Sequence, residues 1–92
     1  MCITYRGGEN METNSLAYVL MSVTPGQEEN ILHDLLKKPY ILEADIIGGA
    51  DYDIIAKFSG DNLNEIAAYI VNMRKSIDGI LKTETLPVLD KI

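Results

Sequence analysis

The segment from Gly48 to Asp53 holds the residues whose types and spacing best suit ligand binding. It reads GGADYD, two glycines followed by Ala50 and by two aspartates that flank Tyr52. Glycine lets a ligand approach backbone N–H groups closely, which suits the capture of a carboxylate. The carboxylate of Asp51 or Asp53 can receive an ammonium group. These groups would form a receptor for an amino-acid zwitterion; the alternative is an ordinary hairpin turn.

Catalytic candidates are few. His33 is the single histidine and lies off the apolar stripe of its predicted helix. Cys2 is the single cysteine, and a nucleophile in that N-terminal segment would have no fixed oxyanion site. One cysteine excludes an internal disulfide and fits a reducing compartment. We therefore predict no catalytic residue, no enzyme activity and a cytoplasmic location.

Four acidic residues gather on or near this segment: Glu43, Asp45, Asp51 and Asp53. Carboxylate oxygens suit a hard cation, but the spacing matches no EF-hand loop. Turn formation and one ion pair with Lys57 account for the same residues. The glycine pair also lacks the further Gly and Lys of a phosphate-binding loop. We predict neither a metal nor a cofactor.

The composition limits the partners. With 92 residues the chain forms one small domain, and its net charge of −6 argues against binding nucleic-acid phosphates or an anionic membrane. The longest apolar run, Leu16 to Met21, is too short to span a bilayer. A domain this small is marginally stable alone, so we expect self-association.

The chain divides into a flexible tail over 1–15, a folded domain over 16–89 and a short C-terminal tail over 90–92. Translation can start at Met1 or at Met11. Within the folded part, the spacing of apolar residues predicts a strand over 16–23 that is apolar on both faces. It then predicts a helix that runs to about Lys38. Thr24 is the expected N-cap of that helix, with Pro25 at its first position.

A hairpin follows, with strands over 41–47 and 52–58. If the numbers of opposed residues sum to 100, Glu43 faces Lys57. The even positions then form an apolar face: Leu42, Ala44, Ile46, Ile54, Ala56 and Phe58. Asp61 is the expected N-cap of a second helix that ends at Asp78-Gly79. The last strand, over 80–89, carries Lys82 and Glu84 on one face and Thr83 and Thr85 on the other, with Pro87 at an edge.

This order predicts a ferredoxin-like α+β fold, βαββαβ, with two helices on one face of a four-stranded antiparallel sheet. The other face would be bare. Six apolar residues are candidates to project there: Ala17, Val19, Met21, Val23, Ile47 and Ile55. We expect a second copy to cover that face, which predicts a dimer formed through the sheet.

Leu16 to Leu89 resembles the effector-binding domain of the Lrp/AsnC (leucine-responsive/asparagine-sensing) regulators. The resemblance runs in order through AYVLMSV, TPGQEE, ILEADIIGGADYDIIAKF, a second helix and ILKTETLPVL. It departs at Ala50, where one alignment expects glycine, so either Asp51 or Asp53 can be the family aspartate. The helix-turn-helix domain of full-length regulators cannot fit in the first fifteen residues, so we expect a stand-alone sensing domain.

The resemblance implies dimers that assemble further, often into octamers, and an amino-acid effector beside the hairpin near the dimer–dimer contacts. The implied site comprises Gly48, Gly49, Ala50, Asp51, Tyr52 and Asp53, with Thr83 and Thr85 as weaker candidates. The function implied is a sensor that affects transcription by co-assembly with a full-length Lrp/AsnC regulator and does not bind DNA itself. The alternatives are a structural subunit without ligand, an ACT-type sensor, and a small enzyme on a dimeric ferredoxin-like barrel.

Overall fold

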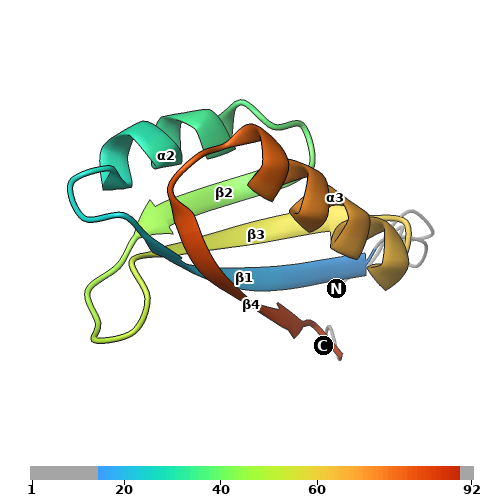
Figure 1. Ribbon diagram of the computed structural model, residues 1–92. Coiled ribbons are helices and arrows are strands. Elements are labelled where there is room, and N and C mark those ends of the chain that lie inside the picture. Colours follow the sequence, from blue (N-terminus) through green and yellow to red (C-terminus); the bar gives the residue numbers. More distant parts are fainter. Residues whose placement is uncertain (1–14, 90–92) are drawn as a thin grey trace.

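The computed structural model describes residues 15–89, which form one four-stranded antiparallel sheet and two helices. The strands are β1 (Ser15–Val23), β2 (Ile41–Ile46), β3 (Ile54–Gly60) and β4 (Ile80–Pro87), and their order in the sheet is β2-β3-β1-β4. Both helices, α2 (Glu28–Leu36) and α3 (Leu63–Ser76), cover the same face of the sheet (Figure 1). The ferredoxin-like prediction is therefore confirmed.

The core lies between the sheet and the helices, and it corrects one prediction. Ala17, Val19 and Met21 are fully buried and pair with the buried residues of β3, so they face the helices. The expectation that they project onto the bare face with Val23, itself 3% exposed, was wrong. Alternation defines two faces of an apolar strand but does not say which face the helices cover.

The open face of the sheet carries the residues between those core positions. Tyr18 pairs with Lys57 on one side and Leu86 on the other, and Leu20 pairs with Ile55 and Glu84. Ile55 was correctly placed on this face, whereas Ile47 lies beyond the end of β2. The apolar part of the open face consists of Leu16, Tyr18, Leu20, Ile55 and Leu86.

The predicted hairpin register holds from Glu43 to Ile46, where opposed numbers sum to 100 and Glu43 pairs with Lys57. A register shift between Ile41 and Glu43 then pairs Ile41 with Phe58. This bulge buries Ile41 and leaves Leu42 56% exposed, so Leu42 does not join the predicted apolar face. The strands are also shorter than predicted at the loop, because β3 begins at Ile54.

Both predicted helix starts were displaced. Gly26 has φ of 89°, which a helix cannot accommodate, so Thr24 to Gln27 form a turn in which the Gln27 N–H donates to the Thr24 carbonyl at 3.0 Å. The N-cap of α2 is Gln27, and its side chain makes no capping hydrogen bond. The N-cap of α3 is Asn62 rather than Asp61, and its Oδ1 accepts from the Glu65 N–H at 2.8 Å.

Thr24 instead joins the turn after β1 to the chain before β4. Its backbone N–H donates to the Gly79 carbonyl at 2.8 Å. β4 ends at Pro87 and pairs with β1 alone, so Pro87 lies on an edge strand as predicted. The predicted tails, including Cys2 and both possible start methionines, lie outside the described residues except for Ser15, which begins β1. Neither described helix is long and apolar enough to cross a membrane.

Candidate functional site

The predicted binding segment forms the loop between β2 and β3, which projects past the end of the sheet (Figure 1). Gly48, Gly49, Ala50 and Asp51 are all exposed. Neither glycine has a positive φ, so the loop does not need the backbone conformations that only glycine adopts easily. A Cβ placed on Gly48 would meet nothing within 4 Å, so this stretch of backbone is open to an approaching molecule.

Asp53 fixes the base of the loop to β1. Its Oδ2 accepts from the Val23 N–H at 2.9 Å, where the register of β1 against β4 shifts. Its own N–H donates to the Met21 carbonyl and its carbonyl accepts from the Ile47 N–H, each at 2.8 Å. Asp53 therefore has a structural role, and its carboxylate is held in one position.

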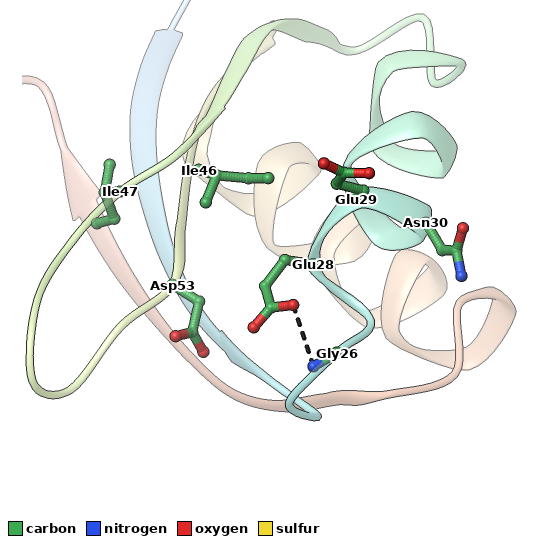
Figure 2. A pocket seen from close by; sticks show the side chains of 7 residues that line it. All are labelled: Gly26, Glu28, Glu29, Asn30, Ile46, Ile47 and Asp53. Atoms are coloured by element: carbon green, nitrogen blue, oxygen red, sulfur yellow. Dashed lines mark hydrogen bonds between the residues drawn. The ribbon is translucent and has the colours of Figure 1, made fainter.

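A cavity of about 430 Å³ opens beside that carboxylate. Its walls come from the base of the loop and from the turn and first residues of α2, as Figure 2 shows. Glu28 lies next to the turn, and its Oε1 accepts from the Gly26 N–H at 3.1 Å. The lining residues are Gly26, Glu28, Glu29, Asn30, Ile46, Ile47 and Asp53.

The chemistry of this cavity suits a positively charged group. Glu28, Glu29 and Asp53 each bring a carboxylate, while the Asn30 amide donates to Gln27 Oε1 at 3.3 Å. Ile46 and Ile47 provide apolar surface for the rest of a ligand. Within residues 15–89 no three acidic, His or Cys side chains are grouped closely enough to hold a metal ion.

Tyr52, the remaining loop residue of the predicted site, contacts the last strand, β4. Its hydroxyl donates to Glu84 Oε1 at 2.7 Å, and Lys82 Nζ lies 4.9 Å from the centre of its ring. The hydrogen bond to Glu84 is the main cause that raises the pKa of Tyr52 above 10.0, followed by desolvation. Tyr52 therefore holds the loop against β4 rather than facing the cavity.

The two threonines do not join this site within one chain. Thr83 and Thr85 pair with Met21 and Val19, so they lie on the helix side of β4. Thr83 Oγ1 accepts from Arg74 Nη1 at 3.4 Å. Thr85 lines a separate apolar groove of about 240 Å³ against α3. His33, as predicted, is exposed on α2.

Sequence reasoning missed the wall that α2 contributes. Gly26, Glu28 and Asn30 were taken only as part of a helix start, and the hydrogen bond that brings Asp53 to Val23 spans 30 residues. One signal was present. β1 ends immediately before TPGQEE and pairs with β3, so the turn after β1 must lie beside the hairpin base.

No protein-family model matches the chain. A curated relative is the HTH-type transcriptional regulator FL11 of Pyrococcus furiosus, 33% identical over 81 residues. The match covers 88% of this chain and 52% of FL11, so the chain spans about half the length of that relative. The crystal structure of FFRP-DM1 is 28% identical with a TM-score of 0.75, and the match covers 82% of this chain and 99% of FFRP-DM1.

The chain is thus similar in sequence to an HTH-type transcriptional regulator and to FFRP-DM1. Escherichia coli AsnC has the same fold, with a TM-score of 0.79 at 21% identity over 90% of this chain and 56% of AsnC. So does the regulator NMB0573 of Neisseria meningitidis, solved as a complex with L-Met, with a TM-score of 0.77 at 16% identity over 91% of this chain and 55% of that one. The relatives named by activity are regulators, not enzymes, in agreement with the prediction of a non-enzymatic domain.

Proposed function

We propose that this domain is an oligomeric sensor that binds an amino acid at the base of the β2–β3 loop. It modulates transcription by co-assembly with a full-length Lrp/AsnC regulator and does not itself contact DNA. Homology to an HTH-type transcriptional regulator supports the regulatory role, and the net charge of −6 argues against a direct DNA contact.

The observation that carries the ligand proposal is the fixed carboxylate of Asp53 in the cavity of Figure 2. An ammonium group would lie between Asp53 and Glu28, with the ligand side chain against Ile46 and Ile47. Because the cavity wall is acidic, the ligand carboxylate would be held outside it, by the open backbone at Gly48 and Gly49. NMB0573 was crystallised with L-Met, so amino acids are the ligand class to test first.

Assembly is proposed through the open face of the sheet. Its apolar residues include Tyr18, 37% exposed, and Leu86, 42% exposed, with charged residues around them. A second copy would bury this surface against its own, and further dimers would meet at the projecting loops, whose tips are exposed in the single chain. Such contacts give an octamer when four dimers close into a ring.

A thermal-shift screen with the twenty amino acids tests the ligand proposal. A ligand at 100 times its dissociation constant adds about 2.7 kcal/mol to the free energy of unfolding, which raises the melting temperature measurably. At least one amino acid should produce this shift. If none shifts the melting temperature at millimolar concentration, the sensor proposal is wrong.

A pair of matched variants locates the site. Asp53→Asn removes the charge but keeps an oxygen that accepts from the Val23 N–H, so the fold should survive while ligand binding is lost. Asp51→Asn removes the same charge from the exposed loop tip and should leave binding nearly unchanged. The reverse result would move the site to Asp51.

Light scattering tests the assembly. The protein should run as a dimer or a multiple of dimers, and Leu20→Glu on the open face should dissociate it. Val71→Glu introduces the same charge at a position on α3 that is 53% exposed and should leave the assembly intact. A folded monomer of the unaltered chain would contradict the proposal.

A second candidate is an assembly subunit without a ligand. The hydrogen bonds from the Val23 N–H to Asp53 and from the Tyr52 hydroxyl to Glu84 favour it, because they give both side chains structural roles. It predicts oligomers that no amino acid stabilises.

A further inference from the structure

A second cavity, of about 550 Å³, lies at the end of the sheet opposite the β2–β3 loop. It is formed where the chain enters β2 and where it leaves β3 for α3, next to the start of β1 (Figure 1). The lining residues that matter are Tyr40, Leu42, Gly60, Asp61, Glu65 and Tyr69. We call it the tyrosine-end cavity.

Two stacked tyrosine rings form one wall. The rings of Tyr40 and Tyr69 are nearly parallel, with centroids 4.3 Å apart and 5° between their planes. Tyr40 also packs on Phe58 at 5.6 Å, and Phe58 is fully buried in the core. The stack is therefore anchored in the core, and it ends at the half-buried Tyr69.

Gly60 makes room for this arrangement. A Cβ at Gly60 would lie 3.0 Å from Ile66 Cγ1 and 3.1 Å from Glu65 Oε1, so a side chain there would displace them, and it would touch the Tyr69 ring at 3.4 Å. The glycine thus lets an aromatic ring and a carboxylate share one side of the cavity.

The electrostatics of the cavity favour a cation. Asp61 and Glu65 contribute carboxylates, and Glu65 Oε1 is oriented by the Asp61 N–H, which donates to it at 2.7 Å. The faces of the tyrosine rings are themselves negative. Desolvation raises the pKa of Tyr40, and desolvation followed by the charge of Glu65 raises that of Tyr69, so both phenols stay neutral at physiological pH.

The other described tyrosines differ in one respect. Lys57 Nζ lies 5.7 Å from the ring centre of Tyr18, and Lys82 Nζ lies 4.9 Å from that of Tyr52. No Lys or Arg of residues 15–89 lies over Tyr40 or Tyr69 in the same way, and none lines the tyrosine-end cavity. Among residues 15–89, cations therefore lie over two of the tyrosines and none lies over the stacked pair.

We propose that the tyrosine-end cavity binds an organic cation, whose ammonium or guanidinium group lies over Tyr69 and beside the carboxylates of Asp61 and Glu65. Cation–π attraction and charge pairing act together there, at a partly desolvated site. This site does not depend on the amino-acid site at the loop, and it needs no carboxylate on the ligand.

Calorimetry and the aromatic NMR signals of Tyr69 test the proposal with two probes. Agmatine carries a guanidinium and an ammonium group but no carboxylate, and choline carries a quaternary ammonium. The uncharged isostere of choline, 3,3-dimethylbutan-1-ol, is the control. At least one cation should bind and shift the Tyr69 signals, while the isostere should not. Equal binding of choline and its isostere, or no binding of either cation at millimolar concentration, would overturn the proposal.

Variants then assign the contacts. Tyr69→Leu should weaken cation binding by about 3- to 30-fold, and Tyr69→Phe, which keeps the ring, should retain it. Asp61→Asn, at an exposed position that does not threaten the fold, should weaken it by about 2- to 5-fold. Asp78→Asn, the same change at another exposed position that lines neither cavity, is the matched control and should have no effect. If Tyr69→Leu and Asp61→Asn both bind the cation as tightly as the parent chain, the proposed site is wrong.

Discussion

The two ends of the sheet both combine a helix start with carboxylates, but they are stabilised differently. At the loop end, α2 begins without a side-chain cap, and the geometry depends on hydrogen bonds between distant segments, such as Asp53 to Val23. At the tyrosine end, α3 has a capped start, and the wall is an aromatic stack that continues into the core. Long-range hydrogen bonds fix the carboxylate at the first end, while packing against the core fixes the aromatic wall at the second.

The sharpest test of that difference removes the anchor of the aromatic stack. Phe58→Ala should lower the free energy of unfolding by about 3–5 kcal/mol, because it creates a cavity beneath Tyr40. Leu42→Ala, at a side chain that is 56% exposed in the same region, should change it by no more than about 0.5 kcal/mol. Urea denaturation measures both, and similar losses would mean that the stack is not anchored in the core.

The corresponding test at the loop end removes the Asp53 carboxylate. Asp53→Ala leaves the Val23 N–H without its acceptor and should cost about 1–3 kcal/mol of unfolding free energy. Asp51→Ala, at the exposed tip, should stay within about 0.5 kcal/mol of the parent chain. Denaturation at neutral pH compares them, and a loss for Asp51→Ala as large as that for Asp53→Ala would refute the assignment of the anchoring role.

The two helix starts provide a smaller comparison. Asn62→Ala removes the acceptor of the Glu65 N–H and should cost about 1 kcal/mol, a typical value for an N-cap. Gln27→Ala should lower the free energy of unfolding by only about a few tenths of a kcal/mol, because the Gln27 side chain makes no capping hydrogen bond. Thermal unfolding followed by circular dichroism distinguishes them, and equal losses would show that the Asn62 contact contributes nothing.

The smallest effect is expected at alkaline pH. The pKa values of Tyr40, Tyr52 and Tyr69 are raised in the folded chain, so the folded state keeps these protons where the unfolded state loses them. Their contribution to stability is complete below pH 10.0, the ordinary tyrosine pKa, and is lost as pH rises through the higher native values.

Two variants separate the contributions that the two ends of the sheet make to this loss of stability at alkaline pH. Tyr52→Phe should remove the part that comes from the Glu84 hydrogen bond, and Tyr69→Phe the part that comes from desolvation near Glu65. Urea midpoints between neutral and strongly alkaline pH measure both. A parent chain whose stability rises above pH 10.0 would contradict the sign of the shifts.

Much of the fold was predictable from the sequence, and the site much less so. The order of elements, the pairing of Glu43 with Lys57 and the edge position of Pro87 follow from periodicity and turn chemistry along the chain. The prediction that Thr24 caps the first helix was wrong, because Gly26 has a positive φ and cannot lie within a helix. The cavity wall from α2 was missed because its residues are distant in sequence from Asp53.

The sequence by itself determined a small acidic α+β domain, because local periodicity and charge depend only on which residues follow one another. Tertiary structure alone decided which face of β1 lies inward, since both faces are apolar and only packing against the helices selects Ala17, Val19 and Met21. Tertiary structure also determined which residues line the two cavities. Asp53 and Glu28 line one cavity, and Tyr40 stacks on Tyr69, only after the strands and helices between them have packed into one core.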